Sequence, residues 1–171
     1  MKRTAPLLAA LLSLSLLLAA CGGSPASPTA AATPTTAAVD GYVFVVRGTT
    51  VAMNVPAAPV LEKLGAWQSY NEAPSCAYQG MDKTYTYPGF QVVTYTMDEV
   101  DYVASVLLQD DTLSTPEGLF IGASLDDMKK AYGDGFTQNL GLYTYAKGKM
   151  TLSFLYENGK LAQIEYLAKA S

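Results

Sequence analysis

Apolar and polar residues alternate along most of the chain after residue 40, which is the period-two pattern of half-buried β-strands. The clearest runs are 103–108 and 161–166, which align with each other without gaps. In both runs every second residue is apolar, and these residues predict one buried strand face: Ala104, Val106 and Leu108 in the first, and Ala162, Ile164 and Tyr166 in the second.

Tight turns separate several of these runs. Asn158-Gly159 stands between two strand-like segments and is a strong local signal for a β-hairpin. Near residue 41, the segments 42–46 and 50–53 flank Arg47-Gly48-Thr49 and predict an additional hairpin, which we expect to add an edge to the sheet.

Two short helices are predicted at 57–64 and 125–132, each followed by a glycine suited to a helix C-terminus, Gly65 and Gly133. Ser124 is placed as an N-cap for the second helix, with Asp127 three residues later. The strands that follow each helix share a Tyr-Thr-Tyr tripeptide, at residues 85–87 and 143–145. The sequence therefore predicts an α+β fold of two tandem repeats, each with one short helix packed on a three- to four-stranded antiparallel sheet.

The N-terminus has the layout of a bacterial signal peptide, with Lys2 and Arg3 before an apolar run at 5–18. The run is shorter than the roughly 20 residues of a membrane-spanning helix. The four residues that follow resemble the lipobox of bacterial lipoproteins: Leu18, Ala19, Ala20 and Cys21. The resemblance implies cleavage before Cys21 and attachment of lipid to its thiol.

This organisation predicts a signal peptide at 1–20, a tether at 21–40 rich in Ala, Thr, Pro and Ser, and one α+β domain at 41–171. The first repeat is expected at 41–110 and the second at 111–171. We expect a lipid-anchored protein on the extracytoplasmic face of a cell membrane, and the threonine- and proline-rich tether suits a Gram-positive surface.

Charge narrows the class of partner. Without residues 1–20 the chain keeps nine basic against fifteen acidic residues. An acidic protein of this kind is a poor ligand for nucleic acid, so none is expected as a partner. Membrane contact is expected through the lipid, and the expected macromolecular partner is a protein.

The repeat and the lipobox together resemble tandem-repeat proteins with the fold of β-lactamase inhibitor protein, which is related in shape to small envelope lipoproteins of the SmpA/OmlA type. The resemblance covers most of residues 50–168 and includes a segment with spaced small and apolar residues between Gly122 and Gly133. It implies short helices packed on an antiparallel sheet, one face of which stays open for contact with a protein.

Enzymatic chemistry has few traces here. The chain has no histidine, which excludes Ser-His-Asp and Cys-His arrangements, and it has no zinc-ligand spacing or phosphate loop. We therefore expect no catalytic residue, no metal and no cofactor. An enzyme that uses carboxylates such as Asp110 or Glu157 ranks last among the alternatives.

Two other features have a reactive and an inert interpretation. Cys76 is either a reactive thiol or, as we expect, a buried small apolar residue. Turn acids are either calcium ligands or, as we expect, solvated side chains; they are Asp98, Glu99, Asp101, Asp110 and Asp111.

Tyrosines on the predicted strands are the candidate binding residues: Tyr85, Tyr87, Tyr95, Tyr143 and Tyr145. On an open face they would form a protein-binding surface, whereas under the helices they would form core. We expect a non-enzymatic protein-binding module, with a structural or assembly factor of the cell envelope as the alternative.

Overall fold

The computed structural model describes residues 40–76 and 80–169. All of the described residues belong to one compact unit. The signal peptide, the lipobox with Cys21 and nearly all of the predicted tether lie outside the described residues.

The described residues form two helices and ten strands. The helices are α1 (Ala58–Leu64) and α2 (Leu125–Tyr132), close to the positions predicted. The strands follow one another along the chain as β1 (Val43–Val46), β2 (Thr49–Ala52), β3 (Ser69–Pro74), β4 (Met81–Tyr87), β5 (Phe90–Met97), β6 (Val100–Leu108), β7 (Thr137–Asn139), β8 (Leu142–Lys147), β9 (Met150–Glu157) and β10 (Lys160–Ala168).

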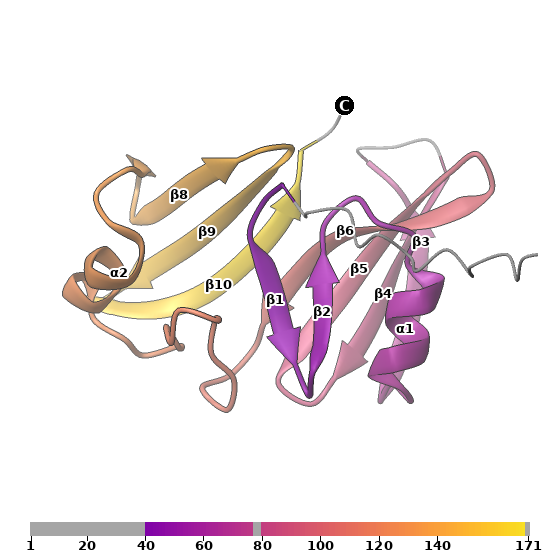
Figure 1. Cartoon of the computed structure of the whole chain (residues 1–171), viewed down its shortest axis with the longest axis horizontal. Helices are drawn as coiled ribbons and strands as arrows, with labels where there is room; N and C mark the ends of the chain where they lie inside the picture. Colours follow the sequence, from indigo (N-terminus) through magenta and orange to yellow (C-terminus); the bar gives the residue numbers. More distant parts are fainter. Residues whose placement is uncertain (1–39, 77–79, 170–171) are drawn as a thin grey trace, which may run out of the picture. The chain divides into compact units, whose positions relative to one another are not determined.

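Eight of the strands form one continuous antiparallel sheet in the order β3-β4-β5-β6-β10-β9-β8-β7 (Figure 1). The prediction of two repeats, each a helix on its own sheet, is therefore wrong. β6 and β10 pair with each other, with Leu108 opposite Ile164 and Val106 opposite Tyr166. Val106, Leu108, Ile164 and Tyr166 all point into the core, so the paired strands continue one buried face without a boundary. Ala162, which was predicted for the same face, is exposed because β10 has an irregularity between Leu161 and Gln163.

The predicted hairpin exists as β1 and β2, but it does not extend the large sheet as expected. Its two-residue loop, Arg47 and Gly48, has positive φ at both positions, as tight hairpin turns require. The hairpin packs across the middle of the large sheet, where the ring of Phe44 lies 5.3 Å from that of Phe90 and 5.9 Å from that of Tyr166. In this position the side chain of Phe44 is fully buried between the hairpin and the large sheet.

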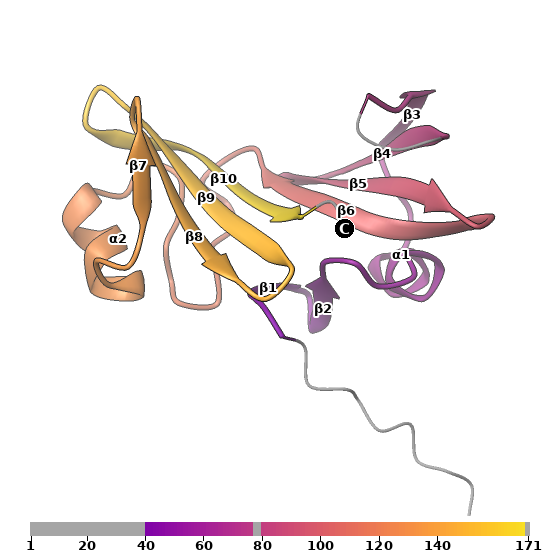
Figure 2. The same ribbon diagram turned by 90° about the horizontal axis from the view of Figure 1, so that it is seen from above.

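Both helices lie on the same face of the sheet as the hairpin (Figures 1 and 2). Tyr132 of α2 packs on Phe154 of β9 with 5.0 Å between ring centroids, and Val60 and Leu64 of α1 are buried. One row of paired residues runs along this inner face over seven strands and is aromatic or aliphatic throughout: Tyr70, Tyr85, Val92, Val106, Tyr166, Leu152 and Tyr145.

A different row appears one residue along each strand, on the opposite face. It crosses all eight strands and consists of Ser69, Thr86, Gln91, Leu107, Glu165, Ser153, Thr144 and Thr137. No helix or strand among residues 40–76 and 80–169 covers this face, which we call the open face (Figure 2). Antiparallel sheets tolerate solvent on one side when that side is polar.

Candidate functional site

The candidate site is the middle of the open face, where β10 and β6 pair. Of the eight residues in the polar row, Glu165 is the charged one, and β10 places it near the middle of the sheet. Leu107 lies directly opposite it on β6, and Ser153 lies opposite it on β9. The strand period puts Glu165 outward because its neighbours Ile164 and Tyr166 both point into the core.

Glu165 is half-buried although no layer covers it. The flanking side chains withdraw it from water, and this burial raises the pKa of its carboxyl group. In the part of the chain that the structure describes, no lysine or arginine forms an ion pair with Glu165. The carboxylate is thus partly desolvated without a compensating charge, which is an unfavourable arrangement that a ligand could relieve.

The surroundings of Glu165 mix aliphatic and hydroxyl side chains. Leu167, two residues along β10, is 41% exposed. Hydroxyls of neighbouring strands contact each other, as Thr144 and Ser153 do at 3.2 Å. The next row across the open face continues this mixture: Asn71, Thr84, Val93, Ser105, Leu167, Thr151 and Ala146. Apolar area around a charged centre is a typical composition for a protein-binding surface.

The tyrosines that the sequence singled out do not form this surface. Tyr85, Tyr87, Tyr95 and Tyr145 are buried and Tyr143 is half-buried. The other interpretation, that the tyrosines form core under the helices, is correct for Tyr85, Tyr87 and Tyr145. Tyr95 stacks on Tyr102 with 5.6 Å between ring centroids and donates to Asn54 at 3.3 Å. The expected exposed tyrosine surface is therefore not found.

Tyr145 shows what such a ring does instead. Its hydroxyl donates to the carbonyl oxygen of Gly133 at 2.6 Å, which ties β8 to the end of α2. Burial raises the pKa of Tyr145 to about 12, so the phenol stays protonated at neutral pH.

The sequence did contain a signal for the open face. In both Tyr-Thr-Tyr tripeptides the tyrosines point inward, and the middle residue, Thr86 or Thr144, belongs to the outer row. Glu165 is likewise the one charged residue inside the apolar run 161–168. A single acidic residue in such a run indicates which side of the strand faces solvent. Because side chains alternate between the two faces, every second residue of the strand then lies on the same outer face.

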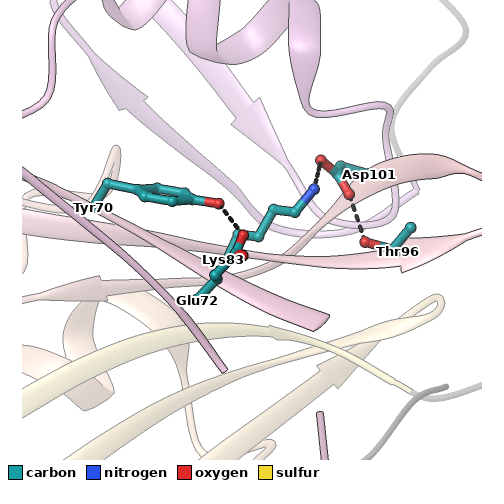
Figure 3. Close-up of polar contacts among 5 residues, drawn as sticks. All are labelled: Tyr70, Glu72, Lys83, Thr96 and Asp101. Carbon is teal, nitrogen blue, oxygen red and sulfur yellow. Dashed lines mark hydrogen bonds and ion pairs between the residues drawn. The ribbon is translucent and has the colours of Figure 1, made fainter. Parts of the chain in front are cut away.

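A second surface lies at the β3 end of the inner face, where Tyr70 and several charged side chains lie close together (Figure 3). Lys83 Nζ lies 2.7 Å from Asp101 Oδ2, and Thr96 donates to Asp101 Oδ1 at 2.6 Å. Tyr70 donates to Glu72 Oε2 at 2.5 Å. Asp101 is one of the turn acids considered for calcium. Its carboxylate already accepts hydrogen bonds from the Lys83 ammonium and the Thr96 hydroxyl. Residues 40–76 and 80–169 hold no cluster of three or more His, Cys, Asp or Glu suited to a metal.

The expectation that Cys76 is buried is wrong. Its thiol is free and its side chain is exposed, just after the end of β3. β3, the strand that leads to Cys76, is exposed along its whole length, so Cys76 follows a segment that lies outside the core. Asp110 and Glu157, the carboxylates of the enzymatic alternative, are also exposed.

Comparisons with known proteins establish little beyond the fold. No family model and no curated protein matches the chain. A crystal structure of an extracellular protein containing an SCP domain, from Bacillus anthracis, superposes with a TM-score of 0.50 at 10% sequence identity. The match covers 68% of this chain and spans 44% of that chain. Among the described residues, no helix is long and apolar enough to cross a membrane.

Proposed function

We propose that this chain is a non-enzymatic, lipid-anchored extracytoplasmic protein whose open face binds a protein partner, with a basic side chain of the partner opposite Glu165. The observation that carries the proposal is the position of Glu165: half-buried, without a cationic partner among the described residues, and near the middle of an uncovered eight-stranded sheet.

Charge complementarity favours a basic partner. The two rows nearest the centre of the open face contain one carboxylate and no lysine or arginine. When a partner covers the face, the remaining water leaves Glu165, and an unpaired carboxylate there would oppose binding. An arginine or lysine opposite Glu165 removes this cost and selects partners of the right charge.

The flanking aliphatic residues supply the rest of the contact. Leu107 and Leu167 stand beside Glu165, and an apolar rim around a central ion pair excludes water from it. A lipid on Cys21, together with a tether, would hold the open face at the cell surface, where an extracytoplasmic partner is accessible.

The binding proposal is tested by placing a photo-reactive amino acid at Leu167 of the full chain in its native membrane. Lys63, an exposed residue of α1 on the covered side, is the control position. We expect an adduct of one defined size from position 167 and none of that size from position 63. Glu165→Lys should abolish the adduct, and Glu165→Gln should weaken it by about tenfold, as expected for loss of a desolvated ion pair.

The same adduct from both positions, or one that survives Glu165→Lys, would refute the proposal. The matched control for the charge change is Glu157→Gln, which removes an exposed carboxylate at the end of β9. It should leave the adduct unchanged.

Anchoring is tested separately with a clickable fatty acid. We expect the label on the wild-type chain and its loss in Cys21→Ser, together with release of that variant from the membrane fraction. A labelled Cys21→Ser variant would contradict the assignment of the lipid to this thiol.

A further inference from the structure

Three rings form a cluster at the β3 end of the inner face; we call Trp67, Tyr70 and Tyr85 the aromatic corner. The ring of Trp67 meets that of Tyr85 edge-on at 5.2 Å, and Tyr70 lies 5.2 Å from Tyr85. Tyr85 is buried, whereas Trp67 is 47% exposed and Tyr70 is 45% exposed. Trp67 and Tyr70 are therefore partly exposed to solvent, and both pack on the buried ring of Tyr85.

A hollow of about 360 Å³ adjoins this base. Ala58 and Leu61 of α1 form one side of it, and Tyr85 forms part of its wall. Glu99 lines it from the turn between β5 and β6, and Asp101 lines it from the start of β6. Both charged residues that line it are acidic. Lys83 neutralises Asp101, but Glu99 forms no ion pair within the described residues.

A further carboxylate lies beside the exposed rings. Glu72 accepts the hydrogen bond of Tyr70, and this bond raises the pKa of Tyr70 to about 12. Glu72 therefore holds the Tyr70 ring in place, and its carboxylate lies at the hydroxyl end of that ring, within electrostatic reach of Lys83. Exposed aromatic faces attract cations through the ring quadrupole, and nearby carboxylates add to that attraction.

We propose that the aromatic corner and the adjoining hollow form a second binding site, which takes an arginine or lysine side chain from a protein. The cation lies on the exposed rings of Trp67 and Tyr70, Glu99 and Glu72 supply the counter-charge, and the hollow accommodates the aliphatic stem. This site lies at the end of the covered face and does not depend on the open face, so the two proposals can fail separately.

Trp67 is the one tryptophan of the chain, so its fluorescence reports on this site alone. The full chain, in detergent, is titrated with three blocked pentapeptides that differ in the central residue: Ala-Ala-Arg-Ala-Ala and the same peptide with Gln or Glu. We expect a saturable change in Trp67 emission with the arginine peptide. Affinity should be about tenfold weaker for the glutamine peptide, the size of one desolvated cation–π and charge contact.

Glu99→Gln tests the counter-charge without touching the reporter or the core, because Glu99 is exposed in a turn. We expect it to weaken binding of the arginine peptide about threefold to tenfold, as for loss of one partly exposed ion pair. The emission of this variant without peptide shows whether the corner is still folded. Glu157→Gln is the control, and it should bind the peptide as the wild-type chain does.

Equal responses to all three peptides, or none with any of them, would overturn the proposal. So would an affinity for arginine that Glu99→Gln and Glu72→Gln leave unchanged. A saturable response to a chitin oligosaccharide that exceeds the response to the arginine peptide would also overturn it, because the rings would then serve to bind sugar.

Discussion

Nζ of Lys83 lies 2.7 Å from Oδ2 of Asp101, and this ion pair joins β4 to the start of β6 across β5. Both side chains are about three-quarters buried, with 24% and 27% exposed. Burial alone would raise the pKa of Asp101, but the hydrogen bonds from Lys83 and Thr96 outweigh it and hold that pKa below its ordinary value. The hydrogen bond to Asp101 in turn raises the pKa of Lys83, although burial opposes it.

Asp101→Asn should therefore lower the free energy of unfolding by about 1 kcal/mol at neutral pH, after allowance for solvent screening. The contribution of a carboxyl with a lowered pKa is present above its unfolded pKa and is lost as pH falls through the folded value. The contribution of Lys83, whose pKa is raised, is lost as pH rises through its folded value. Urea unfolding of both proteins from acid to alkaline pH should give the largest difference near neutrality. A difference that does not change with pH would contradict this account.

Glu165→Gln should stabilise the unbound protein by about 0.5 to 1 kcal/mol at neutral pH, since the change removes a desolvated charge. A raised folded pKa means that the destabilising effect is present above that value and vanishes below the unfolded pKa. The advantage of the variant should thus disappear as pH falls through the ordinary range of a glutamate. Glu157→Gln, which removes an exposed carboxylate, is the matched control and should leave the free energy of unfolding nearly unchanged at neutral pH.

Ser124→Ala should destabilise the fold by about 1 kcal/mol, because it removes the N-cap of α2. Ser124 Oγ accepts from the backbone nitrogen of Asp127 at 3.2 Å, and the Asp127 carboxylate accepts from Ser124. The side-chain hydrogen bond of Ser124 lowers the pKa of Asp127, so NMR titration should find that pKa closer to its ordinary value in the variant. Ser124→Asp, which also caps helices, should recover most of the stability.

Cys76 should react with a maleimide in the folded protein nearly as fast as in urea. The measurement is made in the Cys21→Ser background, in which Cys76 is the remaining thiol. Strong protection in the folded state would show that the exposed position of Cys76 is wrong.

Local signals in the sequence predicted local structure well. Gly65 and Gly133 end the two helices as expected, Asn158 and Gly159 form a turn with positive φ, and Ser124 caps α2. Each of these features depends on residues only a few positions apart, so a short stretch of sequence is enough to predict it.

Two kinds of feature escaped prediction. β3 and β7 are exposed along their whole length and have no apolar alternation to reveal them. The pairing of β6 with β10 joins segments more than fifty residues apart, and neither segment contains a sequence signal that identifies its pairing partner. The candidate site has the same limit. Strand parity predicts that Glu165 points outward, but its place near the centre of one sheet follows from the β6–β10 pairing.

The hairpin β1–β2 has a mechanical consequence. It comes first among the described elements, and Phe44 is wedged between a ring of β5 and a ring of β10. Tension applied at the N-terminal end of the chain, where a membrane anchor would pull, therefore enters the fold at β1. Because Phe44 packs on the large sheet, a pulling force would have to remove this ring from the core before it reaches the strands of the large sheet. The hairpin would then be the first element to resist mechanical unfolding at a cell surface.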